Sequence, residues 1–205
     1  MTDILSMDLS QKLSDLRARR EQVLEKAGNF DRSINFPAYQ GYRGYFYYAA
    51  GPILKQAVSS GIHILIISGA YGLVLATESI CRYESLFYNE NWQDIENQKH
   101  FLGEVSLEYA KKNSLTHVRI IVTTGKSYEQ FARSVEWNRG RFNDVILLGF
   151  HSSNKSNEHL TVEGKCFVTL LNSTGPEDFD AAFANLLVQY PNVHFQKEVL
   201  SQQDR

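Results

Sequence analysis

The chain has 205 residues, of which 43% are apolar, and its 21 basic and 23 acidic side chains give a formal charge of −2. This length and apolar content suffice for one sizeable core, so a single domain is expected. The near-neutral balance disfavours nucleic-acid binding by the whole surface, which needs clustered Lys and Arg. No apolar run is long enough to span a bilayer and no signal-peptide pattern is present, so we expect a cytoplasmic protein without a membrane partner.

Metal and disulfide chemistry are not indicated by the sequence. Cys81 and Cys166, the two cysteines, are far apart, and the six histidines show no His-x-x-x-His spacing. We therefore predict no bound metal and no cofactor. Two groups of arginines could each form a local basic patch, but because each is interleaved with acids we favour their interpretation as solvated helix faces. These groups are Arg17, Arg19 and Arg20, and Arg133, Arg139 and Arg141.

Helix and strand patterns alternate along the chain, which predicts an α/β fold with a mainly parallel or mixed central sheet flanked by helices. Residues 1–36 are interpreted as an N-terminal helix and linker, and residues 37–205 as one globular α/β domain. In chain order we expect a helix at 10–27, a loop at 29–44, a helix at 45–60, a strand at 62–67, a helix at 91–113, a strand at 118–123, a helix at 127–137, a strand at 144–150, a polar loop at 151–159, a strand at 166–171 and a helix at 176–189. The four strands are expected in one mainly parallel sheet.

The most informative stretch is Ile62–Leu73, where an aliphatic run is followed by Ser68-Gly69-Ala70-Tyr71-Gly72-Leu73. This pattern is typical of a buried parallel strand that ends in a loop whose backbone approaches another group closely. Ligands of open α/β sheets bind at that end of the strands. The alternative is a plain turn in which Tyr71 covers the sheet end and no ligand is needed.

Ser68–Leu73, followed by Glu78 and Tyr83, resembles the Ser-Gly-x-Tyr-Gly-hydrophobic, acidic, Tyr pattern of the YaaA peroxide-stress proteins and of smaller uncharacterised domains related to them. Blocks at Pro37–Tyr42 and Val122–Glu129 resemble further blocks of that family, in the same order. The resemblance covers residues 37–135. It implies DNA binding and protection against hydrogen peroxide.

The chain also departs from the family pattern. The opening strand of YaaA-type proteins, which ends in Ser-Pro-Ala-Lys, has no counterpart here. The family's Arg-Pro-Leu-Asp is replaced by Leu75-Ala76-Thr77-Glu78, so a cation is lost while the acid is kept. Arg82, in the block Arg82-Tyr83-Glu84, is a candidate to return that charge. We therefore interpret the chain as a divergent relative.

Gly125-Lys126-Ser127 follows a predicted strand and invites comparison with a phosphate-binding loop. A P-loop needs a second glycine where this chain has Ile120, so that motif is absent. A strand, a glycine turn and a helix N-terminus still offer unpaired N–H groups to an anion. In the alternative interpretation, Thr124 and Ser127 simply cap the helix.

Tyrosines are dense between Phe36 and Tyr48. Such rings stack on bases at ~1–3 kcal/mol each in single-strand binders. Tyr39 and Tyr42 are expected at the mouth of a ligand site, where Arg43 can pair with an anionic ligand, whereas Phe46 and Tyr47 are expected in the core. In the alternative, Tyr45 and Tyr48 pack the helix onto the sheet and no ligand is involved.

Together these blocks define the predicted site. The expected ligand-binding residues are Tyr39, Tyr42, Arg43, Ser68, Gly69, Tyr71, Gly72, Gly125, Lys126, Ser127 and Tyr128, and the candidate catalytic residues are Glu78, Tyr83 and Glu84. A polar and aromatic pocket without a nucleophilic pair suits a small planar ligand such as a base or nucleotide.

Two functions stay open. The first is a YaaA-like, stress-related protein that binds a nucleotide or nucleic acid. The second is a small enzyme that cleaves an N-glycosidic bond in a nucleoside, nucleotide or modified base, as a glycosidase does with a carboxylate. We favour the binding protein because no residue indicates catalysis.

Overall fold

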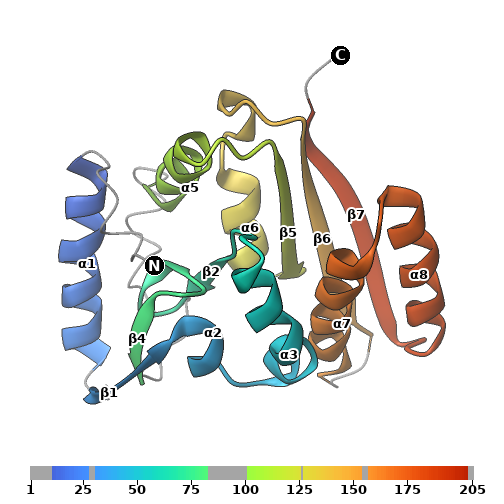
Figure 1. The fold of residues 1–205 in the computed structure, drawn as a ribbon, viewed down its shortest axis with the longest axis horizontal. Helices are drawn as coiled ribbons and strands as arrows, with labels where there is room; N and C mark the ends of the chain where they lie inside the picture. Colours follow the sequence, from blue (N-terminus) through green and yellow to red (C-terminus); the bar gives the residue numbers. More distant parts are fainter. Residues whose placement is uncertain (1–10, 28–30, 83–100, 126, 154–156, 203–205) are drawn as a thin grey trace.

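The computed structural model of the protein describes residues 11–27, 31–82, 101–125, 127–153 and 157–202. Tyr83, Glu84 and Lys126 lie outside the described residues, as does the first part of the helix expected at 91–113. The predicted α/β fold class is confirmed, because strands and helices alternate and the sheets are mixed (Figure 1).

The helical elements are α1 (Gln11–Ala27), α2 (Ala38–Gly41), α3 (Tyr45–Ser59), α5 (Phe101–Lys112), α6 (Ser127–Ser134), the 3-10 turn η2 (Trp137–Arg139), α7 (Glu158–Asn172) and α8 (Pro176–Val188). The strands are β1 (Asp31–Pro37), β2 (Leu65–Ser68), β3 (Gly72–Leu75), β4 (Ser79–Arg82), β5 (His117–Thr123), β6 (Asp144–Ser152) and β7 (Val193–Gln202).

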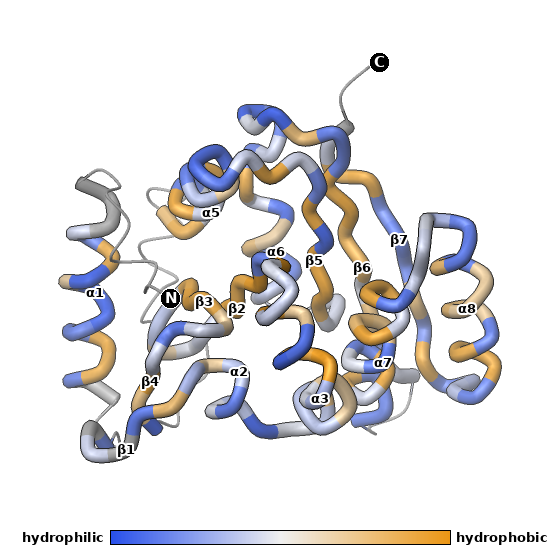
Figure 2. The backbone as a smooth tube through the Cα atoms, in the orientation of Figure 1, coloured by the Kyte–Doolittle hydropathy of each residue, from blue (hydrophilic) through white to orange (hydrophobic). Residues whose placement is uncertain are grey.

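The largest sheet has the strand order β5-β6-β7. β5 and β6 are parallel, as predicted, and run in register from His117 opposite Asp144 to Thr123 opposite Phe150. β7 is antiparallel to β6. Helices α7 and α8 cover one face through a cluster that includes Phe150 and Cys166, and α6 covers the other face through Ala132. Helices therefore lie on both faces of this sheet, β6 is its most buried strand and most of β7 is exposed. Figure 2 shows β6 as hydrophobic along much of its length.

The strand expected at Ile62–Ile67 is not part of that sheet. The ladder begins at Leu65, and β2 pairs antiparallel with β3 in a hairpin. Within the described ranges, no ladder joins β2 to β5. The prediction of a parallel partner was wrong because the glycines after Ser68 reverse the chain tightly instead of leading it into a helix.

Two further expectations are corrected. Residues 29–44 are not a continuous loop, since β1 pairs antiparallel with β4 and α2 follows directly. The segment at 166–171 is helical, because it continues α7, whose buried Val162 and Cys166 are four residues apart. A short apolar run such as Cys166–Leu171 is compatible with either a strand or a helix by periodicity alone. β7 was not predicted at all.

The second core lies around the hairpin. Leu16, Val23 and Leu24 of α1 contribute to a cluster that also contains Leu73 and Leu102. Their helical spacing explains why α1 forms and which face it buries. In Figure 1, α1 stands at the left edge of the molecule, with the β1 and β4 strands beside it and the three-stranded sheet on the far side. The chain thus has a hairpin half and a sheet half.

Candidate ligand-binding site

The Ser-Gly-Ala-Tyr-Gly loop is the tip of the β2–β3 hairpin. Ser68 and Gly72 are paired in the ladder, and the N–H of Tyr71 donates to Ser68 Oγ at 3.0 Å. Gly72 has a φ of 68°, which a side chain would disfavour. The hydroxyl of Tyr71 accepts the N–H of Cys81 at 3.0 Å. Ser68, Gly69, Tyr71 and Gly72 are all buried, so much of the hydrogen bonding of this loop is internal.

Glu78 is buried beneath α1 and forms an ion pair with Arg20, which is also buried. Arg20 Nε donates to the carbonyl oxygen of Tyr71 at 2.9 Å, and Glu78 Oε2 accepts the N–H of Leu75 at 3.2 Å. Arg20 is therefore not on a solvated helix face, contrary to expectation. A cation from α1 thus stands beside the acid of this loop. The geometry gives Glu78 a structural role in joining α1 to the hairpin.

The Gly125 turn follows β5 and precedes α6. Gly125 has a φ of 70°, and its N–H donates to Glu129 Oε2 at 2.6 Å. Arg133 Nε donates to the other oxygen of Glu129 at 3.0 Å. Burial opposes ionisation of Glu129, but these two hydrogen bonds outweigh it and hold its pKa below the usual value. An anion of the chain itself therefore occupies the position at which the sequence suggested an external anion.

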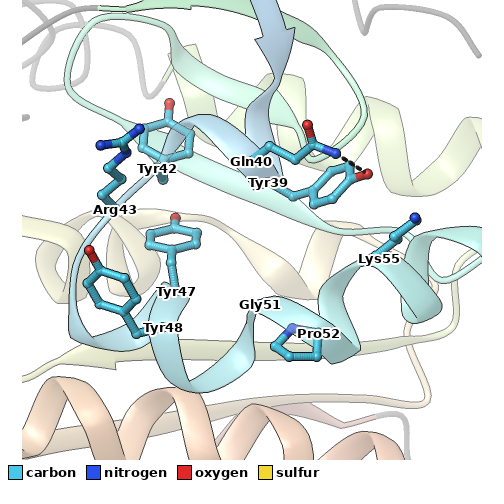
Figure 3. A pocket seen from close by; sticks show the side chains of 9 residues that line it. All are labelled: Tyr39, Gln40, Tyr42, Arg43, Tyr47, Tyr48, Gly51, Pro52 and Lys55. Atoms are coloured by element: carbon cyan, nitrogen blue, oxygen red, sulfur yellow. Dashed lines mark hydrogen bonds between the residues drawn. The ribbon is translucent and has the colours of Figure 1, made fainter.

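A tyrosine pocket of about 470 Å³ lies between α2 and α3 (Figure 3). We use this name for the pocket lined by Tyr39, Gln40, Tyr42, Arg43, Tyr47, Tyr48, Gly51, Pro52 and Lys55. The rings of Tyr42 and Tyr47 are stacked, with centroids 5.4 Å apart and planes 24° apart. Gln40 Nε2 donates to the hydroxyl of Tyr39 at 2.8 Å.

Helical spacing builds the wall that α3 contributes to this pocket. Tyr47, Gly51 and Lys55 are four residues apart and so share one face of the helix. A Cβ added at Gly51 would meet no atom within 4 Å, so the glycine leaves open space. Tyr48 is 77% exposed and Tyr45 is 53% exposed. These two rings do not pack α3 onto a sheet. Tyr47, expected in the core, is half-buried: it packs against the core cluster around the hairpin and also lines the pocket.

A larger inner cavity of about 1430 Å³ separates the hairpin half from the sheet half. Residues 62–69, ahead of and within β2, line one side and residues 117–123 of β5 line the other. The inner cavity shares four lining residues with the tyrosine pocket, namely Gln40, Tyr42, Arg43 and Tyr47. The two spaces therefore adjoin at one wall.

The structure brings together part of the predicted site. Tyr42, Arg43, Ser68, Gly69 and Tyr128 all line the inner cavity, and Tyr39 lines the adjoining tyrosine pocket. The lining of neither space includes Tyr71, Gly72, Glu78, Gly125 or Ser127. The glycine loop contributes Ser68 and Gly69 to the lining of the inner cavity. The segment around the Gly125 turn contributes Thr123, at the end of β5, and Tyr128.

Sequence reasoning missed Glu163, on α7. Its Oε1 accepts the hydroxyl proton of Thr123 at 2.7 Å, and burial raises the pKa of Glu163 to about 7. Of the described residues that line the inner cavity, Glu163 alone is acidic. The signal that could have found it is its position beside Val162 and ahead of Cys166, on the buried face of a helix. That face was hidden because residues 166–171 were assigned to a strand.

Other sites are not evident in the described part of the chain. No group of three His, Cys, Asp or Glu side chains lies close enough together there to hold a metal ion. None of the helices in the described ranges combines the length and apolar character that a bilayer crossing requires. Comparison of the chain with protein-family models, curated proteins and solved structures gives no significant match.

Proposed function

We propose that the protein binds a nucleotide-like ligand, a planar ring carrying an anionic group, in the tyrosine pocket. The observation that carries this proposal is the composition of the pocket wall. Four tyrosines and two cations, Arg43 and Lys55, line it, and no acid is among the described lining residues. Neither cation has an ion-pair partner in the described ranges.

The chemistry of such a wall matches the two parts of a nucleotide. Tyrosine faces stack on bases, and Tyr42 and Tyr47 line both this pocket and the adjoining inner cavity. The guanidinium of Arg43 can hold a phosphate with two parallel hydrogen bonds, and the Lys55 ammonium adds a point charge. A pocket of about 470 Å³ is also of the size that takes a small molecule.

This proposal keeps the first of the two functions predicted from the sequence, nucleotide or nucleic-acid binding of the YaaA type. The enzyme alternative depended on Glu78, Tyr83 and Glu84. Glu78 is paired with Arg20 and lines neither space, while Tyr83 and Glu84 lie outside the described residues. Binding therefore has the better support. The charge of −2 and the small pocket favour a nucleotide over duplex DNA.

Titration calorimetry with adenosine monophosphate (AMP), adenosine and inorganic phosphate tests the proposal. Wild type should bind AMP most tightly, and less tightly as salt rises, because the phosphate contact is screened. Tyr47→Ala should weaken AMP binding about 5- to 100-fold through lost stacking. Gly51→Leu should block it, since the added side chain points into open space.

Two matched controls accompany these variants. Tyr45→Ala removes an exposed tyrosine of the same helix that does not line the pocket, and Lys111→Gln removes an exposed cation of α5. Both should bind AMP as wild type does. The proposal fails if no nucleotide binds, or if Tyr45→Ala and Tyr47→Ala weaken binding equally.

A further inference from the structure

The described residues that line the inner cavity include one acid, Glu163, and three arginines. Much of the rest of its lining is aliphatic, from Ile62–Ile67 and Val118–Val122. Arg119 is paired with Asp144 at 2.6 Å, Arg43 lies at the wall shared with the tyrosine pocket, and Arg82 interacts electrostatically with Asp31. Glu163 faces this space from α7 without a cation beside it among the recorded ion pairs of the described chain.

We propose that Glu163, oriented by Thr123, is the group that recognises the edge of an amino-substituted nucleobase inside the inner cavity. This inference rests on the proposed function, because the ligand enters through the tyrosine pocket. It goes beyond that function by assigning a recognition residue and a class of base. The site predicted from the sequence contained neither Glu163 nor Thr123.

The geometry around the carboxyl fixes which atoms are offered to a ligand. Thr123 Oγ1 donates to Glu163 Oε1 at 2.7 Å, which occupies one lone pair of that oxygen. No hydrogen bond within the described chain reaches Oε2. The carboxyl group is thus held at one oxygen and available at the other, in a cavity that its own side chain lines.

Burial disfavours the charged form of the acid and raises the pKa of Glu163 to about 7, so the carboxyl is neutral below that pH. A neutral carboxyl presents an O–H donor at Oε2 beside a C=O acceptor at Oε1. Adenine and cytosine each place a ring nitrogen acceptor next to an exocyclic amine donor. The carboxyl O–H can donate to the ring nitrogen while the exocyclic amine donates to Oε1. One base can therefore pair with both oxygens of Glu163 and leave no buried polar group unpaired.

The space is sufficient for this arrangement. A typical small-molecule site has a volume of about 300–1,000 Å³, and the inner cavity, at about 1430 Å³, exceeds it. Because Tyr42, Arg43 and Tyr47 line both spaces, a nucleotide can place its phosphate at Arg43 and its base further in. The tyrosine pocket is then the entrance and the inner cavity the place where the base is read.

The test compares AMP with purine riboside monophosphate, which lacks only the exocyclic amine, and with ribose 5-phosphate. Calorimetry is carried out on wild type, Glu163→Leu and Glu163→Gln, with circular dichroism as the folding control. Wild type should bind AMP at least tenfold more tightly than purine riboside monophosphate. Glu163→Leu should remove that preference and leave ribose 5-phosphate binding unchanged. Glu163→Gln should retain part of the preference, because an amide also offers a donor and an acceptor.

A matched control is Cys166→Ala, which alters a buried side chain of the same helix that does not line the cavity. It should keep the wild-type preference. Equal binding of AMP and purine riboside monophosphate by wild type overturns the role of Glu163 while leaving nucleotide binding intact. So does a folded Glu163→Leu variant that keeps the preference. Failure of AMP and ribose 5-phosphate to bind wild type overturns the proposed function itself, and with it the inference that rests on it.

Discussion

Glu78 beneath the hairpin and Glu163 beside β5 are buried to nearly the same extent, with exposed fractions of 3% and 6%, but their surroundings are opposite. Glu78 meets the guanidinium of Arg20 and the N–H of Leu75. Glu163 meets one hydroxyl, that of Thr123, and a cavity. A buried charge persists when it is paired and hydrogen-bonded, whereas an unpaired acid is held neutral.

The two regions therefore use a buried acid for different ends. In the hairpin half the acid, its cation and the backbone around them form a closed network that ties α1 to the β2–β3 turn. In the sheet half the acid is left open toward space that a ligand can occupy. The two acids are alike in burial, and what distinguishes them is the cation beside Glu78.

The largest expected effect comes from breaking the closed network. Arg20→Leu leaves Glu78 buried without its cation, and the loss of one partner of a buried pair costs about 3–5 kcal/mol of unfolding free energy. Urea unfolding measures this loss. Arg19→Leu, on the same helix, removes an exposed hydrogen bond to Gln22 and should cost less than about 1 kcal/mol.

The double variant Arg20→Leu/Glu78→Leu sharpens this result. Replacement of both charges by apolar side chains should recover most of the stability lost in the single variant, because no buried charge is left uncompensated. A loss of less than about 1 kcal/mol in Arg20→Leu would contradict the structural role of the pair.

Glu163 should give the opposite kind of signature, a dependence of stability on pH. Burial raises its pKa from 4.5 to about 7, so between these values the folded protein binds a proton that the unfolded chain has released. Stability from this group is fully present below pH 4.5 and is lost as pH rises toward 7. The loss amounts to roughly 3 kcal/mol over the window.

Glu163→Gln isolates that contribution, because the amide does not titrate. The difference in unfolding free energy between wild type and Glu163→Gln should shift by roughly 3 kcal/mol in favour of the variant from pH 5 to pH 8. Groups with a lowered pKa, such as Asp144 and Glu198, act in both proteins and cancel in the difference. A difference that is flat across this range would mean that Glu163 stays charged in the folded state.

The hydroxyl of Tyr71 tests whether the glycine loop is structural. Tyr71→Phe leaves the N–H of Cys81 without the partner that it has at 3.0 Å, and an unsatisfied buried donor costs about 1–3 kcal/mol. Tyr48→Phe is the control, because its hydroxyl is on an exposed ring and the change should stay within about 0.5 kcal/mol. Equal effects of the two variants would show that the Tyr71 hydroxyl adds nothing to the hairpin.

The sequence predicted best where one local signal decided the element. The helices α1, α3, α6 and α8 and the strands β5 and β6 follow from apolar periodicity with caps or glycine stops, and all are found within a few residues of their predicted bounds. The prediction of a strand at Cys166–Leu171 was wrong because these six residues, all apolar or hydroxyl-bearing, show no periodicity of their own. The helical phase appears only when Val162, four residues before Cys166, is included.

Partners distant in sequence were beyond local reasoning. The pairing of β2 was assigned to a parallel neighbour, but the turn at Gly72 returns the chain on itself. Arg20 and Glu78 are 58 residues apart, so no local pattern could predict that they form a pair. Thr123 and Glu163 are 40 residues apart and meet only because α7 packs on β5. Tyr39 and Tyr42 were predicted at a ligand site because they lie close together in sequence beside Arg43, whereas Tyr47 and Tyr48 of α3 were not predicted to line it.

The smallest expected effect concerns the hydroxyl that orients Glu163. Thr123→Val keeps the shape of the side chain and removes one hydrogen bond to Oε1, which should cost about 1 kcal/mol at pH 5, where Glu163 is neutral. At pH 8 the acceptor is ionised, and hydrogen bonds to charged groups contribute about 1.5–3 kcal/mol, so the cost should be larger there. In the wild type this hydrogen bond favours the charged form of Glu163. Its removal should therefore raise the pKa of Glu163 further. Urea unfolding at the two pH values measures the difference, with Thr116→Val, at an exposed position, as the control. A stability cost that is the same at pH 5 and pH 8 would mean that the Thr123 hydroxyl does not respond to the ionisation of Glu163. The side chain of Glu163 would then be oriented by packing alone.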